Sequence, residues 1–177
     1  MVKILKSVIL IAISITLASM TFYDINFQNG KTGETINFSD FKGKVVMVVN
    51  TASLCGFAKQ YGEMQKLWEK YRDKDFILIA VPTNDFMNQE PKSDAEIVSF
   101  CEINFGINFP ITQKVTSKGK DIHPFFKYSK ENFKGFSGPN WNFYKYIFDK
   151  EGNAIAWFSS FTSPNSKKIE KILEEIL

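Results

Sequence analysis

The sequence predicts an α/β fold in which helices flank a central mixed β-sheet. Two apolar runs, one within residues 44–56 and one at 75–82, have the length and composition of buried strands. The segment between them has the period of an amphipathic helix, and a strand–helix–strand unit of this kind makes its strands parallel. Residues 141–149 and 154–161 have the pattern of an antiparallel hairpin. We therefore expect a sheet that contains both kinds of pairing.

A short hairpin is expected before the first buried strand. Residues 22–27 and 32–38 have strand character, and the polar residues 28–31 separate them. The Asn29-Gly30 step is a common source of the positive φ angles that a tight turn needs. Ser39 and Asp40 then turn the chain into the buried strand.

The first helix is predicted over residues 58–72, and Cys55 lies where the buried strand leads into it. A helix start carries unpaired N–H groups and the positive end of the helix dipole, so a thiolate is favoured there. A lone cysteine in this place is also commonly a small core residue without chemistry. Position alone leaves both interpretations open. The helix is indicated by apolar residues at three- and four-residue steps, namely Tyr61, Met64, Leu67, Trp68 and Tyr71.

A polar loop, Thr83–Lys92, follows the second buried strand. It leaves the sheet at the carboxyl edge, where open α/β sheets gather their functional groups, and Cys55 emerges at the same edge. Ser93 and Glu96 have the spacing of a capping box, which predicts a helix over residues 94–104. Cys101 is expected on or near the buried face of this helix.

The C-terminal part is expected to hold a short extended piece at 111–115, a brief helix at 124–130, and the hairpin, which turns around Gly152. Ser163 and Pro164 are expected to cap and open the last helix. A parallel pair followed by an antiparallel hairpin, with helices between and after, is the element order of a thioredoxin-like fold. We find no internal repeat and no linker, so we predict one domain over residues 20–177.

The composition and the first residues narrow the class of protein. With 44% hydrophobic and 15% aromatic residues the chain can build a core, and a net charge of +3 spread without runs argues against nucleic-acid binding. Lys3 and Lys6 precede an apolar run, 7–18, that ends in small residues, which is the layout of a signal peptide over residues 1–19. The run is shorter than the ~20 residues that span a bilayer. We expect export to a periplasm or secretion rather than an uncleaved membrane anchor.

Three separated motifs resemble the signatures of the glutathione peroxidase family, in the same order and spacing. They are NTASLCGFAKQY at Asn50–Tyr61, NDFMNQEP at Asn84–Pro91 and WNFYKYIFDKEG at Trp141–Gly152. The resemblance covers roughly residues 22–177. It implies a thiol peroxidase that reduces hydrogen peroxide and organic or lipid hydroperoxides in the response to oxidative stress.

Carried over motif by motif, the resemblance implies that Cys55 is the peroxidatic residue and that Gln89, Trp141 and Asn142 are its hydrogen-bonding partners. The segment around Cys101 resembles that of family members with a resolving cysteine. Thioredoxin or glutathione is then the implied thiol reductant, a co-substrate rather than a bound cofactor. The segment between residues 123 and 141 is too short for the loop through which tetrameric members associate, so the resemblance implies a monomer.

The sequence departs from the family pattern at Thr83, and two other functions stay open. Thr83 stands where many relatives have a cysteine, which excludes that position as the resolving one. His123, the single histidine, cannot assemble a metal site with two cysteines. A thiol-disulfide oxidoreductase is one alternative, although Cys55 lacks a C-x-x-C partner. A non-enzymatic redox sensor or secreted domain with a structural disulfide between Cys55 and Cys101 is another.

Overall fold

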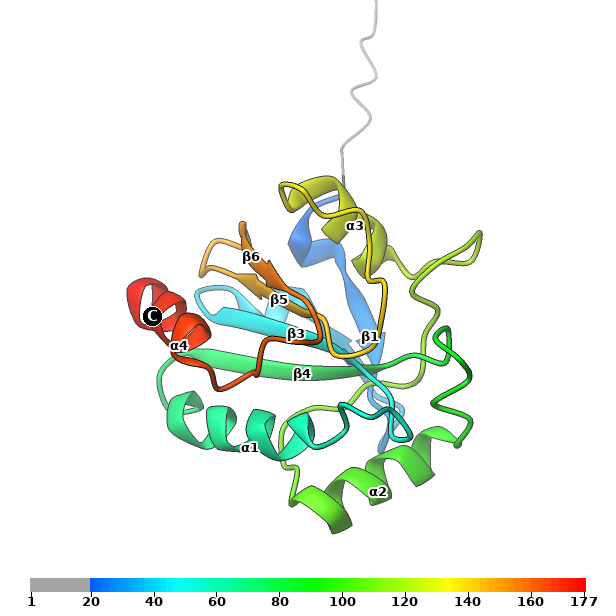
Figure 1. Cartoon of the computed structure of the whole chain (residues 1–177). Helices are drawn as coiled ribbons and strands as arrows, with labels where there is room; N and C mark the ends of the chain where they lie inside the picture. Colours follow the sequence, from blue (N-terminus) through cyan, green and yellow to red (C-terminus); the bar gives the residue numbers. More distant parts are fainter. Residues whose placement is uncertain (1–19) are drawn as a thin grey trace, which may run out of the picture.

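The computed structural model describes residues 20–177, and the signal peptide expected at residues 1–19 lies outside the described residues. A four-stranded mixed sheet forms the centre, with helices on both faces (Figure 1). β3 and β4 are parallel, whereas β5 pairs antiparallel with both β3 and β6. This confirms the predicted thioredoxin-like α/β fold. In the order of the sheet the strands are β4 (Phe76–Pro82), β3 (Val45–Thr51), β5 (Lys145–Phe148) and β6 (Ala154–Phe158).

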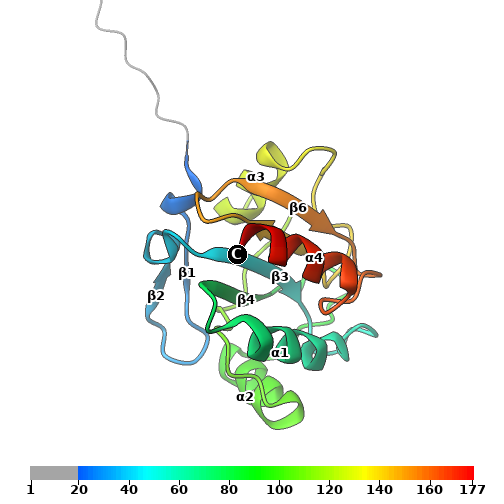
Figure 2. The same ribbon diagram turned by 90° about the vertical axis from the view of Figure 1, so that its left-hand side faces the viewer.

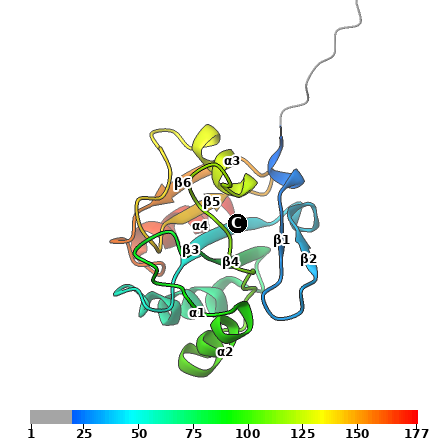
Figure 3. The same ribbon diagram turned by 90° about the vertical axis from the view of Figure 1, so that its right-hand side faces the viewer.

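The side chains of β3 alternate between two hydrophobic cores, one on each face of the sheet. One face is covered by α1 (Gln60–Tyr71) and α4 (Lys167–Ile176), which lie in front of the sheet in Figure 2. α2 (Asp94–Phe105) packs beside α1. On the other face, α3 (Pro124–Asn132) and the amino-terminal segment close the second core (Figure 3). The sheet is thus covered on both sides and open only at its edges.

The predicted amino-terminal hairpin forms, but its turn differs from the expectation. β1 (Asn26–Gln28) pairs antiparallel with β2 (Thr35–Asn37). The positive φ lies at Gly33, at 73°, and not at the Asn29-Gly30 step. Gly30 is needed for a different reason, because a Cβ there would lie 2.9 Å from the carbonyl oxygen of Thr112. Two short 3-10 helices, Phe22–Asp24 and Phe38–Phe41, flank the hairpin.

The predicted starts of β5, α4 and α1 are wrong, for local reasons. β5 begins at Lys145 and not at 141, because Phe143 has a left-handed backbone with a φ of 63° that interrupts the strand. α4 begins at Lys167 after the N-cap Ser166, and not at residues 163–164. The Ser163 hydroxyl is engaged elsewhere and donates to Glu63 Oε2 at 2.8 Å. The chain therefore makes one more turn before the last helix starts.

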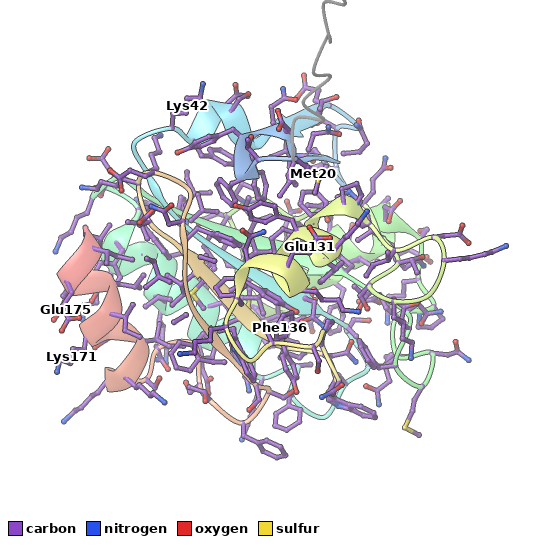
Figure 4. The ribbon with its side chains drawn as sticks, turned by 90° about the horizontal axis from the view of Figure 1, so that it is seen from above. Met20, Lys42, Glu131, Phe136, Lys171 and Glu175 are labelled. Atoms are coloured by element: carbon purple, nitrogen blue, oxygen red, sulfur yellow. The ribbon has the colours of Figure 1, made fainter. Side chains whose placement is uncertain are left out.

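The remaining predicted helices are confirmed with their caps. The capping box of Ser93 and Glu96 opens α2, and His123 is the N-cap of α3, where its Nδ1 accepts the N–H of Phe125 at 3.2 Å. Burial lowers the pKa of His123 to about 4, so its ring is neutral and stacks on Phe27. No helix between residues 20 and 177 has the length and apolar character needed to cross a membrane. Figure 4 shows the charged, outward side of α4, which carries Lys171 and Glu175.

Candidate active site

Three loops meet at one edge of the central sheet. β3 and β4 end there together, since Thr51 pairs with Pro82 at the carboxyl end of the parallel ladder. β5 runs the other way and begins at this edge, where Lys145 pairs with Val49. The loop after β3, the loop after β4 and the loop before β5 therefore converge. They carry Cys55, Gln89 and the pair of Trp141 and Asn142, which the sequence identified as site residues.

Cys55 lies in the loop after β3 and is 5% exposed. Its backbone N–H donates to the carbonyl of Ala52 at 3.3 Å, and its own carbonyl accepts the N–H of Ala58 at 2.9 Å. The helix start expected at residue 58 is wrong, because a turn occupies residues 56–59 and α1 begins only at Gln60. Cys55 thus precedes the first helical turn. Lys59, four residues after Cys55, is exposed, and water solvates its side chain.

Gln89 and Asn142 are in direct contact across the converging loops. Asn142 Nδ2 donates to Gln89 Oε1 at 3.0 Å, and the backbone carbonyl of Gln89 accepts the N–H of Leu54, next to Cys55, at 3.0 Å. The Thr83 hydroxyl donates to Asn142 Oδ1 at 3.4 Å. With its oxygen engaged, Gln89 keeps both Nε2 N–H groups for an acceptor in the site.

Trp141 is half-buried and packs against Phe86, with ring centroids 6.0 Å apart. The side chain of Asn50, at the end of β3, holds the segment in which Trp141 lies. Asn50 Nδ2 donates to the carbonyl of Trp141 at 3.0 Å, and Asn50 Oδ1 accepts the N–H of Tyr144 at 3.0 Å. Asn50 belongs to the first motif, but no pattern around it predicts this role.

The backbone near these side chains departs from ordinary conformations. Met87 and Asn88, just before Gln89, have φ angles of 53° and 51°, and Phe143, just after Asn142, has a φ of 63°. Left-handed backbone at a large residue costs of order 1–3 kcal/mol and persists only where the surroundings hold it. The buried ring of Phe143 packs edge-on against Tyr61 at 5.3 Å. Three of the four non-glycine residues with positive φ between residues 20 and 177 thus lie in the two loops that present the amide and indole groups, and the fourth, Asp75, lies just before β4.

A buried carboxylate ties the Cys55 loop to the Gln89 loop. Glu90 is fully buried and accepts hydrogen bonds from the Ser53 N–H at 2.6 Å and the Ser53 hydroxyl at 2.7 Å. Lys92 Nζ donates to the same hydroxyl at 2.8 Å. Desolvation raises the pKa of Glu90, while the bonds from Ser53 and the nearby lysines act in the opposite direction. Sequence reasoning missed this clamp, although Glu90 lies inside the second motif.

Cys101 lies on the inner face of α2 and is fully buried, as predicted. Both cysteines are free thiols in the structure, and both belong to the core beneath α1 and α2. Desolvation raises the pKa of Cys101 to about 12, although the neighbouring Tyr61 hydroxyl acts to lower it. A thiol with this pKa is almost wholly protonated at neutral pH and is a poor nucleophile while α2 stays closed.

The site gathers a sulfur and neutral donors rather than a set of metal ligands. Within residues 20–177 no three His, Cys, Asp or Glu side chains lie close enough together to hold a metal ion. Amide and indole N–H groups can donate to a developing negative charge without adding a charge of their own. A thiol on a loop that meets the loops of such donors suits attack on a weak bond between two oxygen atoms.

Comparison with known proteins agrees with this geometry. Residues 22–130 match the family model described as glutathione peroxidase. The chain is 41% identical over 160 residues to "Glutathione peroxidase-like peroxiredoxin 2" of Saccharomyces cerevisiae, which covers 88% of this chain and 98% of that protein. It is 41% identical over 158 residues to a "Glutathione peroxidase" of Lactococcus lactis subsp. cremoris, covering 87% and 100% of the two chains.

A solved structure described as Trgpx in apo form superposes with a TM-score of 0.71 at 29% identity, over 89% of this chain and 96% of that one. The fold, the three converging motifs and the matched family model thus point the same way. The chain belongs to the glutathione peroxidase family and is a peroxidase.

Proposed function

We propose that Cys55 is the peroxidatic thiol and that Gln89, Trp141 and Asn142 are the hydrogen-bond donors that serve it. The observation that carries this proposal is the convergence of three loops on one sheet edge, with Asn142 bonded to Gln89 at 3.0 Å and Gln89 bonded to the residue before Cys55. The four residues come from three motifs that are far apart in sequence, and the fold brings the loops that carry them to the same sheet edge.

The proposed first step is the attack of the Cys55 thiolate on one oxygen of a hydroperoxide. The S–O bond forms as the O–O bond breaks, so Cys55 is oxidised to a sulfenic acid and the peroxide is reduced. The second oxygen leaves with the electron pair of the O–O bond and takes up a proton to become water or an alcohol. Donors from Gln89, Asn142 and Trp141 stabilise the charge that develops on this oxygen. Hydrogen peroxide and organic or lipid hydroperoxides fit this step equally.

We further propose that Cys101 resolves the sulfenic acid. Its thiol sulfur attacks Cys55 sulfur, a disulfide forms, and the hydroxyl leaves as water. Cys101 is fully buried and burial raises its pKa to about 12, so α2 has to open locally before this attack. The two Cα atoms must also come within about 7 Å of each other.

A thiol reductant then returns two electrons and two protons to the disulfide. We propose a thioredoxin-like protein, with glutathione as the alternative, because a two-cysteine cycle ends in an intramolecular disulfide that a dithiol protein reduces well. The relatives named glutathione peroxidase-like peroxiredoxin support a peroxidase of this kind.

We propose that the protein acts as a monomer of one domain, 20–177, exported by the leader at 1–19. An exported enzyme of this type needs a reducing partner outside the cytosol, since an oxidising compartment would otherwise keep Cys55 and Cys101 joined.

The test is a single turnover of the reduced protein with one equivalent of hydrogen peroxide, followed by thiol counting and intact mass. The parent should lose two thiols, and Cys101→Ser should stop at a sulfenic acid or its adduct. Cys55→Ser should lose none at a comparable rate. If parent and Cys55→Ser react equally slowly, the proposal fails, and the two cysteines are a structural pair.

A further inference from the structure

Lys145 is a fully buried lysine that the proposed chemistry does not use. It lies at the start of β5 with 0% of its surface exposed. Its Nζ donates to Gln60 Oε1 at 2.6 Å and to the carbonyl of Ser159 at 3.4 Å. Within residues 20–177 it forms no ion pair, although Glu63 on α1 is close enough to favour its charged form.

The contact with Gln60 is the first of a chain of hydrogen bonds that leads to the site. Gln60 Nε2 donates to the carbonyl of Ser160 at 2.6 Å, and the Ser160 hydroxyl donates to the backbone carbonyl of Asn142 at 2.6 Å. The side chain of Asn142 in turn donates to Gln89. The residues between Lys145 and Gln89 are all at most 4% exposed, so water does not compete for these bonds.

Burying a lysine in this place is costly for the folded protein. An ammonium group without a paired carboxylate loses its hydration, and an apolar side chain of similar length would fill the same space without that loss. The bond from Lys145 to Gln60 and the bond from Gln60 to Ser160 are both 2.6 Å, shorter than the usual value of about 2.9–3.0 Å for N–H···O contacts. The bond from the Ser160 hydroxyl to Asn142 is also 2.6 Å, against about 2.7–2.8 Å for O–H···O contacts. The cost indicates a use other than packing.

The end of this chain is a strained part of the backbone. Asn142 immediately precedes Phe143, whose φ is 63°, so the direction of the Asn142 side chain depends on a conformation that the surroundings must hold. The Asn50 side chain and main chain hold the segment from the β3 side, and the bond from Ser160 holds it from the β6 side. Lys145 and Gln60 fix Ser160 in turn.

We propose that Lys145 is a positioning residue for peroxide reduction, which acts through Gln60 and Ser160 to hold Asn142 against Gln89. The inference rests on the proposed function of Asn142. It assigns no contact between Lys145 and the substrate. Its effect on the reaction must therefore pass through Asn142, and this is the property that an experiment can isolate.

The test is a double-mutant cycle on the second-order rate constant for oxidation of the reduced protein by hydrogen peroxide. Lys145→Met, Asn142→Ala, the double variant and the parent are compared at one pH by stopped flow. We expect Lys145→Met to slow the parent about tenfold, since a small displacement in an active site has effects of this size or larger. In the Asn142→Ala background we expect less than about a twofold change.

Ser160→Ala breaks the same chain by removing a single oxygen atom and keeps the test valid if Lys145→Met does not fold. It should show the same loss in the parent and the same absence of a loss beside Asn142→Ala. Ile147→Val is the control, because it removes one methyl group from the same buried strand without touching the chain. Its effect should stay below about twofold in both backgrounds.

An unchanged rate in Lys145→Met and Ser160→Ala would overturn the inference. So would equal losses in the two backgrounds, or an Asn142→Ala variant as fast as the parent. In each of these cases a parent that still reacts far faster than Cys55→Ser would leave the proposed role of Cys55 intact. An Asn142→Ala variant as fast as the parent would in addition remove Asn142 from the proposed donors. If the parent reacts no faster than Cys55→Ser, the proposed function fails and this inference fails with it.

Discussion

Two buried charged side chains, Glu90 and Lys145, support a site whose own donors are neutral. Both are 0% exposed. Glu90 is bonded to Ser53 in the loop that carries Cys55, and Lys145 is linked to Asn142 through Gln60 and Ser160. A charge that loses its hydration lowers stability unless hydrogen bonds compensate for the loss. Substitutions at these two residues can therefore separate an effect on the stability of the protein from an effect on the geometry of the site.

Glu90→Gln should lower the free energy of unfolding by about 1–3 kcal/mol, because the N–H and the hydroxyl of Ser53 bind different carboxylate oxygens and one of these becomes an NH2 group that cannot accept. Denaturant unfolding measures the change. The matched control is Glu96→Gln: Glu96 also accepts from the N–H and hydroxyl of one serine, Ser93, but on the exposed surface. The loss in Glu96→Gln should be clearly smaller than the loss in Glu90→Gln, because water solvates the exposed amide and both bonds from Ser93 use one oxygen atom. Equal losses in both variants would contradict the special role of burial.

Lys145 should make stability depend on pH. Desolvation lowers its pKa from 10.5 to about 7, against the opposing charge of Glu63. Between pH 7 and pH 10.5 the unfolded chain holds a proton that the folded protein has lost, so stability rises with pH through this window. From pH 7 to pH 9 the gain attributable to Lys145 is about 2 kcal/mol.

The measurement is the difference in unfolding free energy between the parent and Lys145→Met at pH 7 and at pH 9. The difference should change in favour of the parent as pH rises. The charged group that acts on Lys145 is Glu63 on α1. Lys168 on α4 lies over the ring of Phe158, the residue paired with Lys145 on β6. Both are present in the two proteins. A pH-independent difference would show that Lys145 keeps its charge when folded.

The proposed conformational step is a local opening of the helix α2. Its inner face is apolar and places Cys101 in the core, where burial raises the pKa of the thiol to about 12. The helix is joined to the rest of the fold by its core contacts, by the ion pair of Lys31 with Glu102 and by the bond from the Lys114 N–H to Asp94 Oδ1. Ile103 on its outer face is 82% exposed. A helix held from one side can open without unfolding the sheet.

We expect oxidation by hydrogen peroxide to increase amide hydrogen exchange in residues 94–105, because in the proposed cycle α2 opens to bring the buried Cys101 to Cys55. Hydrogen exchange with mass spectrometry compares the reduced and oxidised parent. Cys101→Ser treated in the same way is the control and should keep its protection, since no disulfide forms. Unchanged exchange in the oxidised parent, with both thiols consumed, would contradict the opening of α2.

Across the whole molecule, the fold was predictable because hydrophobic periodicity identifies buried strands and amphipathic helices directly. β3, β4, α1 and α2 are all recognisable in this way. The starts of β5 and α4 were not, because they depend on the left-handed backbone of Phe143 and on the bond from Ser163 to Glu63. Both are tertiary effects that no local pattern records.

The residues of the site also divide into those that local sequence motifs predict and those that depend on tertiary contacts. Its motifs gave Cys55, Gln89, Trp141 and Asn142, and the structure brings the loops that carry them together. The supporting groups were not predictable, because a buried lysine such as Lys145 has the same sequence signature as an exposed one until the strand is placed. The structure adds to the site chiefly the residues that hold its loops.

The most direct test of the whole account is the rate at which the reduced protein consumes hydrogen peroxide in a single turnover at neutral pH, in the parent and in Cys55→Ser. The account predicts that the parent reacts at least about a thousandfold faster, as expected for a nucleophile supported by positioned donors. Cys101→Ser should retain the fast first step, because the resolving thiol acts only afterwards. Equal rates in the parent and Cys55→Ser would contradict the account at its centre.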